Sequence, residues 1–210
     1  MGNFIKFNDV LPEDKKTWVN KSILSFDIDW ASDEVLNYVI DSIERFKIPC
    51  TFFITHNSTI IQRLRAIPHL VELGVHPNFN PLINQELNAK SVKDTLKYLF
   101  DIVPEAKVLR SHSMTHSATW LGLYKEFGVT HLSQYFMNLS ESISPFRHIN
   151  NLVEVPIYFA DDGYIYSNQK NKWSEKNQDF LFKSNNFIKV YNFHPIHIAL
   201  NSNNFDYYNN

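Results

Sequence analysis

Strand-like and helix-like stretches alternate along most of this sequence, with short connections between them. Residues 22–26 and 51–55 are runs of apolar, β-branched and aromatic residues of strand length, whereas apolar residues recur at helical spacing over 35–43 and 92–103. Apolar strands separated by amphipathic helices are typical of a parallel sheet that is covered by helices. The alternation therefore predicts an α/β fold.

The same pattern continues less regularly towards the end of the chain. Further helices are expected over 59–66 and 118–127, and further strands over 74–76, 107–112, 130–136, 152–159 and 187–193. Ser32 and Ser91 stand where the caps of two helices are expected. About seven strands in 210 residues predict an irregular or incomplete barrel, because the full eightfold barrel usually needs ~250 residues. Residues 169–179 are expected to form an exposed loop that leads into a helix, and 201–210 to fray.

Length and composition predict one domain that spans residues 1–210, with a core over about 22–200. The formal net charge of -2 provides no broad basic surface for nucleic acid. Cys50 is the only cysteine, so no intrachain disulfide can form, and no apolar run approaches the ~20 residues that span a bilayer. The first residues do not resemble a secretory signal, so a cytoplasmic location is expected. The oligomeric state stays open.

Polar side chains gather in four segments, each at the end of an apolar run: 25–30, 74–81, 109–113 and 192–197. The carboxyl ends of successive strands are where a β/α barrel assembles its active site. We therefore expect these segments to meet, although they are distant in the sequence. Carboxylates, imidazoles and one guanidinium in such a site indicate metal-assisted hydrolysis.

The first segment holds two carboxylates. Asp27 and Asp29 are two residues apart, so in an ideal strand their side chains point to the same face. Two carboxylates that close repel each other unless a cation lies between them. A divalent metal would resolve the repulsion and still leave one carboxylate free to act as a base. Alternatively, Asp29 simply caps the following helix.

The second segment contains His76, which leads into a stretch with two prolines. Pro81 disfavours the helical conformation at Asn80, so we expect a rigid loop rather than an ordinary helix. Asn80 either offers its carbonyl oxygen to a metal or, like Asn78, only closes the loop.

The last two segments supply the cation and further imidazoles. Arg110 and His112 are two residues apart on a predicted strand and should share one face. An inward guanidinium needs a carboxylate partner, here Asp27, whereas the alternative is an exposed surface arginine. His194 and His197 flank a proline at the end of the last strand, which indicates that at least one of them belongs to the site.

The ordered set of these residues resembles the polysaccharide deacetylases, the NodB-homology or carbohydrate esterase family 4 enzymes. Four runs are most similar to the WbmS-type branch found with O-antigen and capsule genes, namely FDIDW at 26–30, HPNFNP at 76–81, RSHS at 110–113 and FHPIH at 193–197. The resemblance spans roughly residues 22–200. It implies a distorted (β/α)7 barrel that removes acetyl groups from N-acetylated sugars with a divalent metal, usually zinc.

The resemblance also implies a role for each residue of the set. Asp27 corresponds to the general base, Asp29 and His76 to metal ligands, Arg110 to the group that orients the base, and His194 to the general acid.

Two departures from the family pattern affect the metal site. Asn80 stands where a second metal-binding histidine is usual, so either Asn80 itself or another residue such as His112 would complete the ligand set. Ile28 is inserted between the two acids, which leaves the division of roles between them open. Contact with the substrate is assigned to Trp30, Asn78 and His197.

We therefore expect a metal-dependent amide hydrolase. Its expected substrate is an N-acylated sugar, in the form of a sugar nucleotide or a lipid-linked saccharide that is a precursor of a bacterial surface polysaccharide. A glycosyltransferase is the alternative, because these enzymes also bind a divalent ion with two acids that are separated by one residue. This alternative explains neither His76 nor the pair His194 and His197. A barrel that binds a sugar without turnover, or hydrolyses a C–N bond without metal, is the other alternative.

Overall fold

The computed structural model describes residues 4–167 and 186–202. Its strands are β1 (Phe4–Ile5), β2 (Ser22–Asp27), β3 (Cys50–Ile54), β4 (Val71–Val75), β5 (Val108–Leu109), β6 (His131–Leu132), β7 (Phe146–Arg147), β8 (Val153–Glu154), β9 (Phe159–Ala160) and β10 (Lys189–Phe193). Its α-helices are α1 (Asp33–Phe46), α2 (Ile60–Arg65), α3 (Asn80–Ile83), α4 (Val92–Ile102), α5 (Leu121–Glu126), α6 (Asp161–Ser167) and α8 (Pro195–Ala199). Short 3-10 turns include η1 (Phe7–Asp9) and η3 (His112–Met114).

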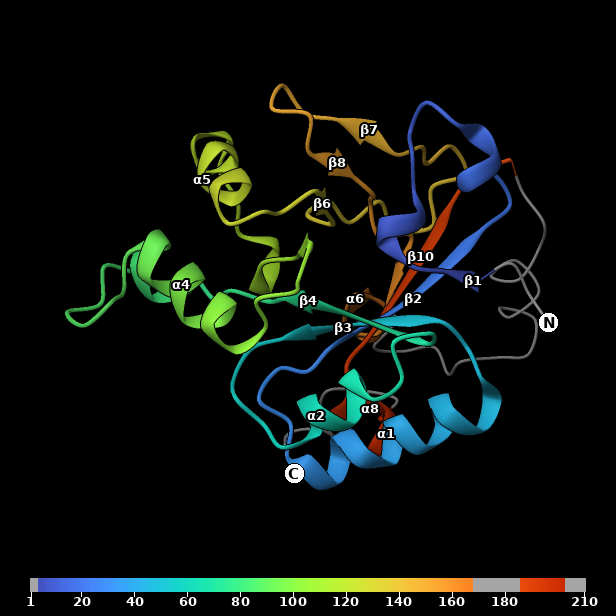
Figure 1. The fold of residues 1–210 in the computed structure, drawn as a ribbon, viewed down its shortest axis with the longest axis horizontal. Coiled ribbons are helices and arrows are strands. Elements are labelled where there is room, and N and C mark those ends of the chain that lie inside the picture. Colours follow the sequence, from blue (N-terminus) through green and yellow to red (C-terminus); the bar gives the residue numbers. More distant parts are fainter. Residues whose placement is uncertain (1–3, 168–185, 203–210) are drawn as a thin grey trace.

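The described strands form one curled sheet in the order β7-β8-β6-β5-β4-β3-β2-β10-β9, and β1 adds to β2. Within it β7 pairs antiparallel with β8, and the other described pairs are parallel. β8 and β9 lie on one stretch of chain that pairs with β6 at one end and with β10 at the other. With these two strands counted as one, seven parallel segments follow one another around the sheet (Figure 1). The predicted distorted barrel is confirmed.

Helix α1 shows why the periodic stretches become helices that cover this sheet. The Ser32 hydroxyl accepts a hydrogen bond from the backbone N–H of Val35 and so caps the helix, as predicted. One stripe of α1 is buried against the sheet, and it consists of Leu36, Val39, Ile40 and Ile43. Below the helices, Phe52 of β3 joins this outer core, whereas its neighbour Phe53 points into the barrel interior. Both faces of the strand are therefore apolar.

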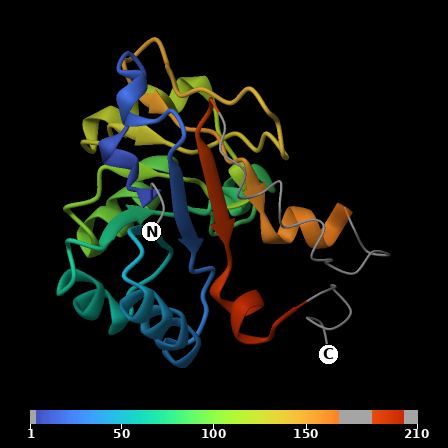
Figure 2. The same cartoon turned by 90° about the vertical axis from the view of Figure 1, so that its right-hand side faces the viewer.

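The N-terminal segment closes the end of the barrel where the strands begin. Phe7 of η1 is fully buried and packs edge-on against Phe53, with 5.6 Å between ring centroids. The buried Glu72 carboxylate, at the start of β4, accepts hydrogen bonds from the backbone N–H groups of Phe7 and Asn8 and from the Thr51 hydroxyl. This closure leaves the opposite end, where the parallel strands finish, for the polar side chains. Figure 2 shows β2 and β10 side by side, both pointing to that end.

Several sequence-based boundaries are wrong. β4 begins at Val71, so the apolar stretch before Gly74 belongs to the strand. β5 ends at Leu109, and His112 lies in a 3-10 turn rather than on the strand. Pro81 does not prevent a helix, since a proline fits the first turn of α3, where its missing N–H is not needed.

The expected loop at 169–179 and most of the expected frayed tail lie outside the described residues. In the described ranges, none of the helices combines the length and apolar character needed to cross a bilayer.

Candidate active site

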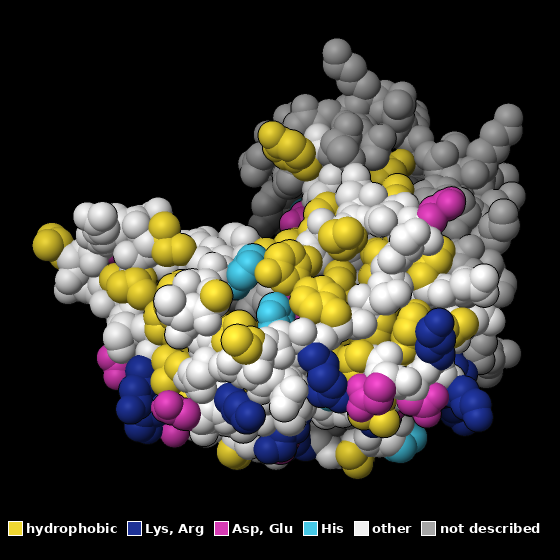
Figure 3. Space-filling view, turned by 90° about the horizontal axis from the view of Figure 1, so that it is seen from above, with side chains coloured by type: hydrophobic (Ala, Val, Ile, Leu, Met, Phe, Trp, Pro, Cys, Tyr) yellow, Lys and Arg dark blue, Asp and Glu magenta, His cyan; other side chains and the backbone are white. Residues whose placement is uncertain are grey.

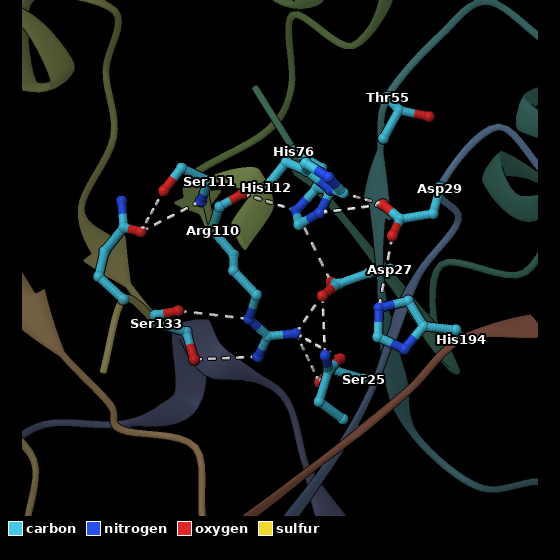
Figure 4. A network of polar contacts seen from close by, with 12 residues as sticks. Ser25, Asp27, Asp29, Thr55, His76, Arg110, Ser111, His112, Ser133 and His194 are labelled. Carbon is cyan, nitrogen blue, oxygen red and sulfur yellow. Dashed lines mark hydrogen bonds and ion pairs between the residues drawn. The ribbon is translucent and has the colours of Figure 1, made fainter. Parts of the chain in front are cut away.

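The strands bring the predicted site residues together where they end. Asp27 is the last residue of β2, and His76, Arg110 and His194 directly follow β4, β5 and β10. These strands run parallel and are near neighbours in the sheet, with β3 between β4 and β2. Figure 4 shows the side chains converging from the separate strands.

The Asp27 carboxylate is buried and held through both oxygens. Its Oδ1 accepts a hydrogen bond from Arg110 Nη1 at 3.0 Å, and its Oδ2 accepts one from Asn192 Nδ2 at 2.7 Å. Burial by itself raises the pKa of Asp27, but the charges of Arg110, His76 and His194 outweigh it and lower the pKa below its usual value. Asp27 is therefore an ionised carboxylate with a fixed orientation.

Arg110 is enclosed in a polar cradle, and only 1% of the residue is exposed. Its Nη1 also donates to Ser25 Oγ at 3.1 Å and to Asn192 Oδ1 at 2.6 Å. On the other side, Nε and Nη2 donate to the carbonyl and hydroxyl oxygens of Ser133, at 3.3 and 2.9 Å. The structure shows the expected contact of Arg110 with Asp27, whereas sequence reasoning missed the cradle. Asn192, a polar residue between aromatic neighbours near the end of the strand, was the signal that could have revealed part of it.

The chain leaves β2 through a left-handed turn, with φ of 36° at Asp29 and 58° at Trp30. The expectation that Asp27 and Asp29 project from one face of an extended strand is therefore wrong. Left-handed backbone costs residues other than glycine about 1–2 kcal/mol each and persists where surrounding contacts hold it. The turn follows the inserted Ile28, whose side chain is buried in the outer core. It swings Asp29 towards the histidines.

Asp29, His76 and His112 form a compact group of possible metal ligands. Asp29 Oδ1 lies 3.2 Å from His76 Nε2 and 3.2 Å from His112 Nδ1, and the three donor atoms are within 4.8 Å of one another. Burial raises the pKa of Asp29, but the close contacts with His112 and His76 outweigh it and hold the pKa well below its usual value. The same contact with Asp29 raises the pKa of His112.

His194 forms a second histidine–carboxylate pair with Asp161, the first residue of α6. Its Nδ1 donates to Asp161 Oδ1 at 2.7 Å, its backbone N–H donates to Oδ2 at 2.8 Å, and its Nε2 lies 3.5 Å from Asp29 Oδ2. Burial lowers the pKa of His194, but the hydrogen bond to Asp161 and the nearby negative charges outweigh it and raise the pKa to about 10. Sequence reasoning missed Asp161, although it ends an apolar run as the other site residues do.

The structure directs the Asn80 amide to the turn that carries His112. Asn80 Oδ1 accepts a hydrogen bond from the Thr115 hydroxyl at 2.9 Å, and Asn80 Nδ2 donates to Ser113 Oγ at 3.2 Å. Asn78 Oδ1 accepts from the backbone N–H of Asn80 and closes the loop after His76. These contacts join the His76 loop to the turn that contains His112, and it is His112 that lies beside Asp29 and His76.

Two of the remaining predicted residues lie beside this group. Trp30 is 51% exposed, and its ring packs edge-on against His112 with 5.2 Å between centroids. His197 lies on α8, with its ring 5.7 Å from that of His194, and burial lowers the pKa of His197. Trp30 is thus on the rim of the site, and His197 is behind His194.

A curled parallel sheet with acids, histidines and a buried arginine at its carboxyl ends defines a barrel of the NodB-homology deacetylase type. A family model described as "WbmS-like: Polysaccharide deacetylase" matches residues 24–210, and the chain belongs to this family. It is accordingly a hydrolase of carbon–nitrogen bonds in sugar deacetylation, which argues against both the glycosyltransferase and the barrel without turnover.

Solved structures agree with this assignment. The chain is 30% identical, with a TM-score of 0.90, to a Bordetella bronchiseptica protein described as a polysaccharide deacetylase involved in O-antigen biosynthesis, over 99% of this chain and 84% of that one. Two other solved structures share the fold. A Mycobacterium smegmatis protein described as a polysaccharide deacetylase is 15% identical, with a TM-score of 0.52, over 83% of this chain and 77% of that one. A 4-alpha-glucanotransferase from Thermococcus litoralis is 13% identical, with a TM-score of 0.53, over 84% of this chain and 32% of that one. Among curated proteins, none matches the chain.

Proposed function

We propose that this deacetylase uses a divalent metal, most simply zinc, to remove an N-acetyl or other N-acyl group from an amino sugar. The observation that carries the proposal is the group Asp29, His76 and His112, which lies between a buried aspartate, Asp27, and a third histidine, His194. Two imidazoles and one carboxylate are ligands that suit zinc and leave further coordination positions open.

The tautomer of His76 supports a cation at this place. Because the Arg110 backbone oxygen can only accept, His76 Nδ1 must carry the hydrogen of their 2.7 Å bond. A neutral His76 therefore presents the lone pair of Nε2 to Asp29 Oδ1, 3.2 Å away. Two lone pairs that face each other at this distance repel unless a proton or a metal ion lies between them. When bound, zinc would lower the pKa of a water molecule and polarise the acyl carbonyl.

The buried Asp27 is the base that takes the proton of the attacking water. Arg110 and Asn192 each bind one of its oxygens, and since a carboxylate oxygen accepts more than one hydrogen bond, each oxygen keeps capacity for a proton. Arg110 is a positioning residue, because it acts through Asp27 and its own guanidinium is surrounded by protein groups.

His194 is the acid that protonates the departing amine. Asp161 accepts the hydrogen on Nδ1, which leaves Nε2 as the nitrogen that faces the site. Asp27 takes one proton as the water oxygen bonds to the acyl carbon, and the C–N bond then breaks as the amine nitrogen takes the proton from His194. The acyl group leaves as a carboxylic acid, which ionises to a carboxylate by losing its proton to solvent. Trp30, Asn78 and His197 remain proposed substrate contacts, with Trp30 best exposed to pack against a sugar ring.

The substrate class extends the proposal to a precursor of a bacterial surface polysaccharide. The similarity to the Bordetella bronchiseptica protein supports this substrate class, which includes sugar nucleotides and lipid-linked saccharides. A sugar nucleotide as the substrate would place the reaction in the cytoplasm.

The first test measures acetate release by protein that has been stripped with a chelator and then reloaded with zinc. Substrates are N-acetylated amino sugars, their oligomers and their nucleotide-linked forms. We expect release to disappear on stripping and to return on reloading. Full activity of the stripped protein, checked for residual metal by elemental analysis, would contradict the metal requirement.

The second test separates the two candidate ligands by zinc binding alone. His112→Ala should weaken zinc binding by roughly 10-fold or more in equilibrium dialysis, whereas Asn80→Ala should change it much less, because the Asn80 amide is engaged by Thr115 and Ser113. Equal losses in both variants, with unchanged folding by circular dichroism, would refute the ligand set.

A further inference from the structure

The turn that carries His112 has a backbone that needs support from its surroundings. The two residues after His112, Ser113 and Met114, have φ of 53° and 52°. Left-handed backbone is unfavourable for residues other than glycine and persists where surrounding contacts hold it. The position of the His112 ring therefore depends on the contacts that fix this turn.

Gln134, which lies after the carboxyl end of β6, holds the start of the turn. Its Oε1 accepts a hydrogen bond from the backbone N–H of Ser111 at 3.1 Å and lies 2.7 Å from the Ser111 hydroxyl oxygen, whose single proton is shared with the carbonyl of Thr115. Ser111 directly precedes His112, and Figure 4 shows both residues. Gln134 is 2% exposed and Ser111 is fully buried, so water does not compete for these hydrogen bonds.

The Ser111 backbone also fixes which way the Gln134 amide points. A backbone N–H can only donate, so the amide must turn its oxygen, and not its nitrogen, towards Ser111. Among the described residues, Gln134 Nε2 is then left without a hydrogen-bond partner. A buried donor without a partner is costly, which indicates that the contact with Ser111 outweighs the satisfaction of the rest of the side chain.

A buried carboxylate in turn fixes the backbone of Gln134. Glu154 of β8 is fully buried, and its Oε1 accepts a hydrogen bond from the backbone N–H of Gln134 at 2.6 Å. Its Oε2 lies 3.3 Å from His148 Nε2. On the side of the molecule where β7 and β8 lie in Figure 1, hydrophobic side chains gather around histidines at the surface (Figure 3). A chain of buried polar contacts thus runs from Glu154 through Gln134 and Ser111 to the turn of His112.

Two other contacts reach the same turn from the His76 loop. Asn80 binds it only through side chains that follow His112, and the backbone N–H of His112 donates to the carbonyl of Pro77 at 2.9 Å. Gln134 is the residue that binds the buried backbone donor of Ser111, on the opposite side of His112 in the sequence. Without it, the turn would be held from one side only.

We propose that Gln134, anchored by Glu154, is a positioning residue for the metal site, which keeps the His112 ring beside Asp29 and His76. The inference rests on the proposed function, in which His112 is a metal ligand. Gln134 acts through Ser111 and is not itself a ligand. Residues that hold a metal ligand in place change metal affinity by about 10- to 100-fold when they are replaced.

Equilibrium dialysis of the full chain with zinc measures this role. Gln134→Met keeps the length of the side chain but removes the acceptor, and it should weaken zinc binding by roughly 10-fold. Thr51→Val is the matched control, because it removes one buried hydrogen bond, to Glu72 at the opposite end of the barrel, and should leave zinc binding unchanged. Unchanged binding in Gln134→Met, or an equal loss in Thr51→Val, would overturn the inference. Circular dichroism checks that each variant is folded.

A second pair of variants tests the chain without a change at Gln134. Glu154→Leu removes the acceptor of the Gln134 backbone N–H and should weaken zinc binding, whereas Glu154→Gln keeps an acceptor oxygen and should bind zinc nearly as the wild type does. Equal zinc affinities of these two variants would overturn the proposed chain.

A double-variant cycle separates positioning of His112 from a general structural loss. Because Gln134 acts through His112, Gln134→Met should cause no further loss of zinc affinity in His112→Ala, and additive losses would overturn the inference. In the cobalt-loaded protein, the visible absorption, which reports ligand geometry, should change in Gln134→Met and stay unchanged in Thr51→Val. The same spectrum in wild type and Gln134→Met would count against the inference. A His112→Ala variant that binds zinc as tightly as the wild type would instead contradict the ligand set of the proposed function.

Discussion

Replacement of Arg110 with Met would leave the Asp27 carboxylate buried without its guanidinium partner. The side chain of Met has nearly the length of the aliphatic part of Arg, so the change removes charge and hydrogen bonds more than volume. In the wild type, Asp27 and Arg110 are 3% and 1% exposed and share a 3.0 Å ion pair. Removal of one partner from a buried pair costs about 3–5 kcal/mol, because the other charge stays out of water.

Not all of the cradle loses its partners in Arg110→Met. Ser25 Oγ still donates to the Tyr191 carbonyl, and Ser133 Oγ still donates to the Val155 carbonyl. The loss should therefore come mainly from the uncompensated Asp27. The free energy of unfolding of a small domain is about 5–15 kcal/mol, so the variant should still fold but lose a large part of this free energy.

Urea denaturation followed by circular dichroism measures this loss. With a slope of about 2–3 kcal/mol per M, the midpoint of Arg110→Met should fall by roughly 1–2.5 M. Arg65→Met is the matched control, because Arg65 pairs with Glu105 on the surface and an exposed pair contributes about 0–1 kcal/mol. The double variant Asp27→Leu with Arg110→Met should be more stable than Arg110→Met alone. The reasoning is refuted if Arg110→Met and Arg65→Met lose equal stability, or if the double variant is the less stable.

Two further predictions concern packing and pH. Gly74→Ala should lower the free energy of unfolding in urea by about 1–3 kcal/mol, since the added Cβ would lie 2.8 Å from Phe53. Gly122→Ala, whose added Cβ would have its nearest neighbour at 3.9 Å, should raise it by up to about 1 kcal/mol. Equal effects of the two variants would contradict the packing argument. Burial lowers the pKa of His131, so the unfolded chain binds a proton at this histidine more readily than the folded chain does. The stability that His131 contributes is therefore complete above the unfolded pKa of ~6.5 and is lost as the pH falls below that value. His131→Leu should therefore lose less stability than the wild type between pH 7.5 and 5, and parallel curves would count against this.

Sequence reasoning located the elements whose signals are local. The caps Ser32 and Ser91 and the apolar stripes of α1 and α4 lie within a few turns of chain, and the structure places both helices as expected. Strands β2 and β3 were found for the same reason, since continuous apolar runs bounded by polar residues mark them.

The shorter strands could not be defined from the sequence. β5, β6, β8 and β9 are two residues long each, and they exist because parallel neighbours pair with them. The closure of the barrel by the N-terminal segment involves Glu72, whose carboxylate accepts hydrogen bonds from the backbone N–H groups of Phe7 and Asn8, 65 and 64 residues earlier in the sequence. A pairing over that separation leaves no local periodic pattern.

For the site, the sequence determined which chemistry is present and where each strand delivers it. Asp27, His76, Arg110 and His194 stand at strand ends, and parallel strands finish at one end of a barrel, so their meeting followed from topology. The detailed partners were decided by tertiary structure. The left-handed turn at Asp29 depends on how the chain packs after β2, and Asn192 and Asp161 reach their partners across 165 and 33 residues. The sequence carries side-chain chemistry and local periodicity, but the distance between two donor atoms exists only after the sheet has curled.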